Sequence, residues 1–204
     1  MYETLNTIFL QGEIVTEPKI TYTRDEESFY EFDMKIERES KKYDILKIMV
    51  SERVYEKVAG EKFITVLGEI RTRNYKDNPE SEKSHLAVYV FAKDCQLNSN
   101  HKYANEVHLN GFICKTPIYR ETPFSREICD LLIAVNRQNK KRSDYIPSIT
   151  WGRNASFTGM LPIGTAISVT GRLQSREYQK TNGNETTIRT AYELSISAVS
   201  KLEE

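Results

Sequence analysis

The sequence predicts an all-β protein built from two small five-stranded barrels in tandem, each with one short helix. Three observations lead to this prediction: an internal repeat, apolar residues that alternate at period two, and glycines placed inside the strand patterns. All three features occur in both halves of the 204 residues.

The internal repeat is the strongest of these features. The stretch NTIFLQGEIVTEP at 6–18 matches NEVHLNGFICKTP at 105–117, and ITVLGEIRTRNY, which ends at Tyr75, matches ISVTGRLQSREY, which ends at Tyr178. The matches keep the same order along the chain, as expected for a duplicated structural unit. We therefore expect two domains, at residues 1–100 and 105–204, joined by the polar segment 98–106.

Within each repeat, alternating apolar residues indicate about five half-buried strands, as at Met34 and Ile36. A single helical turn is expected at 54–59 and again at 155–160. Glycine weakens a strand unless the strand bends or bulges there. The strand patterns contain Gly12, Gly68, Gly111 and Gly171. Bent strands of this kind form the corners of small barrels.

Charge alone argues against an anionic partner, because 29 basic and 29 acidic side chains give no net charge. The charge is nevertheless divided unequally. Residues 1–104 hold 16 basic and 19 acidic side chains, whereas residues 105–204 hold 13 and 10. The second half is thus the basic one.

Composition also limits the compartment and the chemistry. Cys95, Cys114 and Cys129 are odd in number and lack metal-ligand spacing, so we expect reduced core residues. No apolar run approaches the ~20 residues that span a bilayer, and no secretion leader is recognisable, so a cytoplasmic protein is expected.

The sequence gives no sign of an enzyme. The three histidines have no cysteine or carboxylate partners at ligand spacing, and no glycine loop that could cradle a phosphate is present. The acidic run DEES at 25–28 is interpreted as a solvated loop rather than a metal site. We therefore expect no catalytic residue, no metal and no cofactor.

The second half resembles the bacterial single-stranded-DNA-binding protein (SSB) family through NEVHLNG, LLIAVNR, DYIPSITWGR and VTGRLQSREY, in that order. The first half resembles the same family more weakly, through NTIFLQG and VLGEIRTRNY. The resemblance implies two tandem OB-fold barrels and sequence-independent binding of single-stranded DNA in replication, recombination and repair, near the nucleoid. It also implies a homodimer that presents four barrels. The family usually ends in an acidic tail that recruits repair enzymes, whereas this chain ends at KLEE. Replication or repair proteins therefore stay open as partners.

In the second half, the resemblance places base-stacking aromatics on Tyr145, Trp151 and Tyr178. Stacking does not read base edges, and cations beside the rings neutralise phosphates. A further stacking aromatic of the family is missing from the stretch 138–142. The basic residues within or next to the aromatic motifs are Arg137, Lys140, Lys141, Arg142, Arg153, Arg172 and Arg176.

In the first half, the corresponding candidates are Tyr43, Tyr75, Arg38, Arg71 and Arg73. By alignment, Val50 stands at the position of Trp151 and Asp44 at the position of Tyr145. We therefore expect weaker DNA binding by the first barrel.

Each of these interpretations has an alternative. Trp151 could be a core residue, since it shares strand parity with Pro147 and Ile149. Tyr178 could be an amphipathic hairpin tyrosine, and the run KKR at 140–142 a solvated loop. For the whole protein, the alternative is an OB-fold protein-interaction module or replication-restart accessory factor that uses the acidic first barrel.

Overall fold

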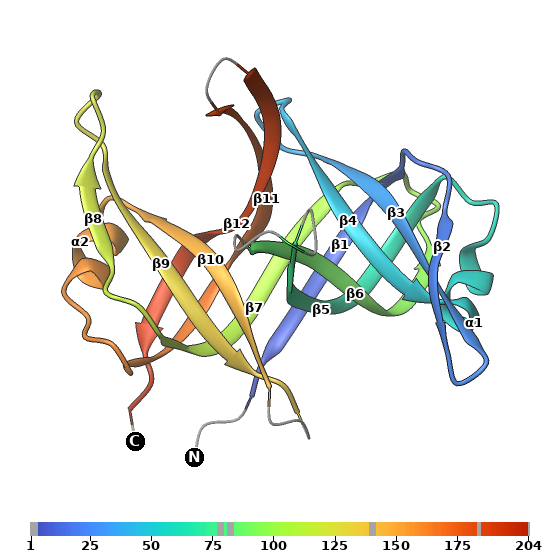
Figure 1. Cartoon of the computed structure of the whole chain (residues 1–204), viewed down its shortest axis with the longest axis horizontal. Helices are drawn as coiled ribbons and strands as arrows, with labels where there is room; N and C mark the ends of the chain where they lie inside the picture. The colour runs from blue at the N-terminus through green and yellow to red at the C-terminus, as the bar shows by residue number, and fades with distance from the viewer. Residues whose placement is uncertain (1–3, 77–79, 81–83, 139–141, 183–184, 204) are drawn as a thin grey trace.

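The computed structural model describes residues 4–76, 80, 84–138, 142–182 and 185–203, and it consists of two β-barrels that lie side by side (Figure 1). In the first barrel the elements are β1 (Asn6–Ile14), β2 (Lys19–Arg24), β3 (Glu27–Glu37), β4 (Tyr43–Ser51), α1 (Glu52–Tyr55), the 3-10 turn η1 (Glu56–Val58), β5 (Phe63–Tyr75) and β6 (His85–Leu97). In the second they are β7 (Ala104–Ile113), β8 (Ile118–Glu121), β9 (Glu127–Asn136), β10 (Ser143–Trp151), α2 (Arg153–Gly159), β11 (Ala166–Asn182) and β12 (Glu185–Lys201).

Five strands close each barrel, as the sequence predicts. In the first barrel the hydrogen-bonded order is β3-β4-β6-β5-β1, and a further pairing of β1 with β3 completes the ring. In the second barrel β9-β10-β12-β11-β7 closes in the same way through β7 and β9. The short strands β2 and β8 lie outside these rings, each paired with the edge of β3 or β9. The all-β, two-barrel prediction is confirmed.

The expected helical turns also form between the third and fourth strands of each ring. In the first barrel α1 and η1 cover 52–58, and in the second α2 covers 153–159. Among the described residues, no helix is long and apolar enough to cross a membrane.

Glycine is required where the long strands bend. The register between β5 and β6 shifts at Leu67/Gly68, and that between β11 and β12 shifts at Thr170/Gly171. A Cβ at Gly68 would collide with the backbone oxygen of Phe91, and one at Gly171 with the backbone oxygen of Ser195. These bulges bend the strands so that one end closes the barrel and the other end projects from it.

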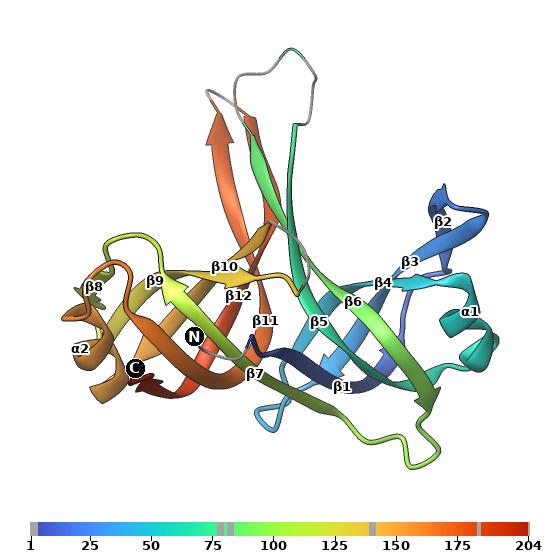
Figure 2. The ribbon, with the colours of Figure 1, turned by 90° about the horizontal axis from the view of Figure 1, so that it is seen from below.

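The two barrels share one sheet, because their first strands pair with each other. β1 and β7 run antiparallel from Asn6↔Leu109 to Gln11↔Ala104, and the equivalent residues Ile8 and Val107 face each other in this register. The barrels are therefore related by an approximate two-fold axis near this residue pair. As a result, the β5–β6 and β11–β12 hairpins rise together on one side of the molecule (Figure 2).

Apolar side chains at alternate positions fill the barrels, including Leu10 and Val66 in the first and Leu109 and Val169 in the second. The cysteines are free thiols: Cys95 and Cys129 are buried and Cys114 is half-buried. Burial raises the pKa of Cys95 to about 12, so this thiol stays protonated at neutral pH.

Asn105 joins β7 to β11 with its side chain. Its amide nitrogen donates to the Leu173 carbonyl at 2.6 Å, and its amide oxygen accepts from the Leu173 N–H at 3.0 Å. In the first barrel Asn6 makes the same two bonds with Ile70. The asparagine shared by both repeats is therefore structural.

We expect Asn105→Ala to lower the free energy of unfolding by about 1–3 kcal/mol, because it leaves two backbone groups of the buried Leu173 without these partners. Urea unfolding followed by circular dichroism measures the change. Asn136→Ala is the matched control, because Asn136 is exposed and its side-chain oxygen accepts a bond from the Ser143 hydroxyl on the neighbouring strand. Equal stability of the Asn105 variant and the wild type would contradict the role of this side chain.

Candidate nucleic-acid interface

The predicted aromatic residues of the second barrel are exposed. The exposed fraction is 46% for Tyr145, 43% for Trp151 and 38% for Tyr178. On β10 the buried face instead holds Ser148 and Thr150, and the Thr150 hydroxyl lies 2.8 Å from that of Thr158 in α2. Because Trp151 is exposed while Ser148 and Thr150 occupy the buried face, the alternative that Trp151 is a core residue is wrong.

These aromatics share the outer sheet face with cations from β11. Ile149 of β10 pairs with Ser195 of β12, and Ser195 pairs with Arg172 of β11. Side chains at every second position of one strand share a face, so Tyr145, Trp151 and Arg172 lie on the same side of this sheet. Arg176 and Tyr178 continue this face along β11.

The cations on this face are accessible. Arg172 is exposed and donates to the side-chain oxygen of Gln174 at 3.3 Å. Arg176 is exposed and lies 4.0 Å from a carboxylate oxygen of Glu193, the outer limit of an ion pair. Arg153 is exposed at the start of α2, two residues after Trp151, and Arg142 is exposed next to β10. Lys140 and Lys141 lie outside the described residues.

A groove of about 410 Å³ lies between the two barrels and is lined by residues of both raised hairpins. Figure 2 shows the two hairpins side by side. Tyr75 from β5 and Tyr178 from β11 both line it, so the equivalent tyrosines of the two repeats meet in one place. Sequence reasoning missed the other lining residues, among them His85, Pro147 and Arg189. The repeated tyrosine was an available signal, because a two-fold relation brings equivalent hairpins together.

Three of the predicted DNA-binding arginines make ion pairs within the protein. Arg38 makes a two-pronged ion pair with the fully buried Asp44, with Nε to Oδ2 at 2.7 Å. Arg137 does the same with the buried Asp144, at 2.9 and 2.6 Å, and these bonds raise the pKa of its guanidinium. Arg71 donates to Asp144 at 3.0 Å and also pairs with Glu69. The charges of these arginines compensate buried carboxylates, and their role in DNA binding stays a prediction.

The same two aspartates join one barrel to the other. Asp144 accepts a hydrogen bond at 2.7 Å from the N–H of Thr72 in the first barrel. Asp44 accepts one at 2.8 Å from the N–H of Ser175 in the second. The carboxylates therefore stabilise the arrangement of both barrels, which sets the position of the groove between the hairpins.

The remaining first-barrel candidates are exposed. Tyr43 lies under the amino group of Lys35, with 5.3 Å between the nitrogen and the ring centroid. The ring of Tyr75 lies 5.7 Å from that of His85, and the Arg73 guanidinium lies 5.9 Å from the ring centroid of Tyr89. Tyr43, Tyr75 and Arg73 therefore remain candidate DNA contacts.

The register corrects the alignment of the repeats by one residue. Asp44 pairs with Ile36 as Asp144 pairs with Val135, so Asp44 corresponds to Asp144. It follows that Ile45 and Ser51, rather than Asp44 and Val50, stand at the positions of Tyr145 and Trp151. The expectation that the first barrel lacks aromatics at these two positions still holds.

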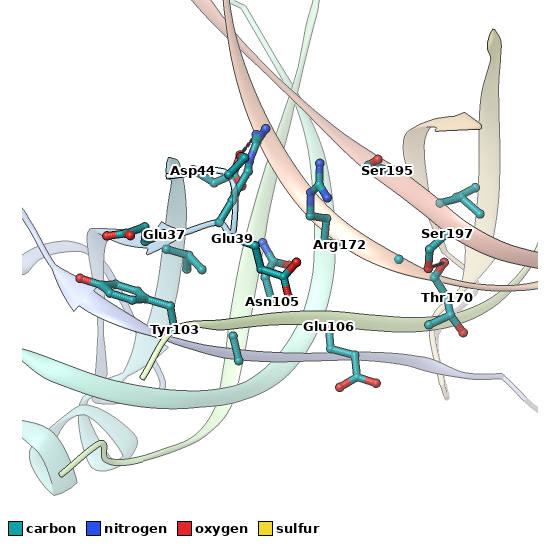
Figure 3. Close-up of a pocket in the computed structure, with 16 residues that line it drawn as sticks. Glu37, Glu39, Asp44, Tyr103, Asn105, Glu106, Thr170, Arg172, Ser195 and Ser197 are labelled. Atoms are coloured by element: carbon teal, nitrogen blue, oxygen red, sulfur yellow. Dashed lines mark hydrogen bonds and ion pairs between the residues drawn. The ribbon is translucent and has the colours of Figure 1, made fainter. Parts of the chain in front are cut away.

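Another pocket, of about 780 Å³, lies between the β3–β4 turn and strands β7, β11 and β12 (Figure 3). Four carboxylates line it, from Glu37, Glu39, Asp44 and Glu106, together with Arg38 and Arg172. Because these carboxylates would repel phosphates, we include no part of this pocket in the candidate interface except Arg172, which also lies on the outer face of β11.

Comparisons with known proteins identify the family and the fold of the chain. A profile of the Single-strand binding protein family matches residues 104–202. Single-stranded DNA-binding protein 1 of Clostridium acetobutylicum is 32% identical over 87 residues, which make up 39% of this chain and 79% of that protein. The chain belongs to the single-strand binding protein family.

Other relatives are longer than the part that matches. Single-stranded DNA-binding protein 1 of Staphylococcus aureus (strain COL) is 35% identical and single-stranded DNA-binding protein A of Bacillus subtilis 34%, each over 85 residues or 39% of this chain. The chain spans about half the length of these two relatives, 51% and 49%. In three dimensions, the single-stranded DNA binding protein of Thermus aquaticus shares the fold, with a TM-score of 0.78 at 21% identity, over 100% of this chain and 95% of that one. Both barrels are therefore OB folds.

We expect Arg137→Gln to destabilise the protein by about 2–4 kcal/mol, because it leaves the buried Asp144 carboxylate with less positive charge. Thermal and urea unfolding measure the loss. Arg153→Gln is the matched control, since it removes the same charge at an exposed position and should change stability by less than about 0.5 kcal/mol. Similar stabilities of the two variants would contradict the structural role of Arg137.

Proposed function

We propose that this protein binds single-stranded DNA without reading its sequence and protects the strand during replication, recombination and repair. The observation that carries the proposal is the outer face of the second barrel, where Tyr145, Trp151 and Tyr178 lie exposed beside Arg172 and Arg176. Exposed rings stack on any base, and the arginines neutralise phosphates. Arg153, Arg142, Lys140 and Lys141 are proposed to add to this positive charge.

The family supports binding rather than catalysis as the activity. The relatives from Clostridium acetobutylicum, Staphylococcus aureus and Bacillus subtilis are each named single-stranded DNA-binding proteins. We propose residues 1–100 and 105–204 as two binding domains, with Tyr43, Tyr75 and Arg73 as contacts of the first. We also propose a homodimer that presents four barrels to one strand.

The single tryptophan makes the site directly testable. We expect oligo(dT) to quench the fluorescence of Trp151, because stacking on a base changes the surroundings of the exposed indole. Trp151→Leu should weaken binding by about 1–3 kcal/mol, measured by the anisotropy of a labelled oligonucleotide. Met160→Leu is the control, because Met160 is also exposed but lies outside this face. Binding without quenching would contradict the role of Trp151.

Salt dependence tests the arginines separately from the rings. If about five phosphates are bound, log affinity should fall against log salt with a slope near −3.5. Arg153→Gln/Arg176→Gln should reduce the magnitude of that slope by about 1.4, since each phosphate contact contributes about 0.7. Lys57→Gln/Lys62→Gln removes the same charge near η1 and should leave the slope unchanged. A flat response in the wild type would favour the alternative of a protein-binding module.

A further inference from the structure

The outer face of the first barrel carries an aromatic cluster that the predicted site does not include. Tyr22 of β2 and Phe29 of β3 are stacked, with ring centroids 4.6 Å apart and ring planes 11° apart. Phe91 of β6 follows at 6.2 Å from Phe29. Tyr22 is 39% exposed, and Phe29 and Phe91 are half-buried. We call these three residues the first-barrel platform.

The platform occupies the same face as the aromatics of the second barrel, but on different strands. Phe29 pairs with Ser51 across β3 and β4, whereas the equivalent pair in the second barrel is Ile128 with Trp151. Each of these two cross-strand pairs thus holds one large ring. In the first repeat the ring is Phe29 on β3, and in the second it is Trp151 on β10, the strand equivalent to β4.

The exchange extends to the neighbouring strand. Met49 pairs with Phe91 across β4 and β6, and the equivalent pair of the second barrel is Ile149 with Ser195. Phe91 therefore has no aromatic counterpart, just as Trp151 has none in the first barrel. The outer faces of the two barrels therefore both carry large rings, but at positions that are not equivalent.

Cations border the platform although the first barrel is acidic as a whole. Arg73 lies over Tyr89, two residues from Phe91, and the Lys93 side chain is 55% exposed while it pairs with Glu69. On the same sheet, Lys47 lies 3.3 Å from both Glu31 and Asp33 and compensates part of their charge.

Carboxylates also lie close to the platform. Glu69 pairs with Phe91 across β5 and β6, and the β2–β3 turn follows the Tyr22–Phe29 pair by two residues. At this turn and α1, carboxylates line a separate pocket, which includes Asp25, Glu26, Glu52 and Glu56. Lys93 and Lys47 compensate part of the negative charge around the rings.

We propose that the first-barrel platform stacks bases of single-stranded DNA, so that one strand is held by Tyr22, Phe29 and Phe91 as well as by the second barrel. The groove that Tyr75 and Tyr178 line lies between the barrels and lets one strand contact both. This inference rests on the proposed function and adds a second set of contacts to it. Rings flanked by cations suit bases and phosphates better than they suit a purely apolar partner.

The test compares oligo(dT) of two lengths on the full chain. One oligonucleotide has about 10 nucleotides, within the span of one barrel, and the other has about 30, enough for both barrels. Tyr22→Leu/Phe91→Leu should leave affinity for the short oligonucleotide nearly unchanged, because the second barrel binds it. Affinity for the long one should fall at least about fivefold, which corresponds to the lower limit of stacking for one base.

Two matched variants complete the experiment. Tyr145→Leu/Trp151→Leu should weaken binding of both oligonucleotides, and Phe124→Leu removes an exposed ring at the β8–β9 turn and should change neither affinity. Circular dichroism and urea unfolding show that each variant is folded, and leucine keeps apolar contacts at the half-buried Phe91.

The outcomes separate the two proposals. If the wild type binds the long oligonucleotide and Tyr22→Leu/Phe91→Leu binds it equally well, the first-barrel platform is overturned while the proposed function stands. The rings would then be free for a protein partner. If the wild type binds neither oligonucleotide, both proposals fail.

Discussion

The antiparallel pairing of β1 with β7 is the constraint on which the rest of the structure depends. It places the equivalent residues Ile8 and Val107 opposite each other and thereby relates the barrels by an approximate two-fold axis. Since the strands that follow are duplicated, that axis brings the two long hairpins together. The groove lined by Tyr75 and Tyr178 is a consequence of this pairing, as is the continuous twelve-stranded sheet among the described residues.

Buried charge makes this arrangement specific. Asp44 and Asp144 are fully buried, and each accepts a backbone N–H from the opposite barrel. A carboxylate is costly to bury unless cations and donors compensate it, so each is also paired with an arginine of its own barrel. Those arginines are therefore committed to the fold. In the proposed function, exposed arginines such as Arg172 and Arg176 bind the phosphates.

The repeat and its alternating pattern were sufficient to predict the barrels and the short helices, because period and order survive in both halves. The direction and the partners of individual side chains were harder to predict. The outward direction of Trp151 depends on Thr150 finding a buried partner in Thr158, which no local pattern shows. The ion pairs of Arg38 and Arg137 were not predicted, because a basic residue near an aromatic motif resembles a binding residue. The equivalent Asp44 and Asp144 were a usable signal, since an arginine and an aspartate recur at nearly the same spacing in both repeats.

The divergence of the repeats also explains why the family profile matches only residues 104–202 while the fold similarity covers the whole chain. A sequence profile records which residue type stands at each position, and in the first repeat Ser51 stands where Trp151 is in the second. Stacking requires only a ring on the outer face, and Phe29 supplies one from the paired strand. Because neighbouring strands share that face, a ring can move between the partners of a cross-strand pair and still offer its surface to a base. On this view the first barrel diverged in sequence while its outer face kept aromatic surface on which a base can stack.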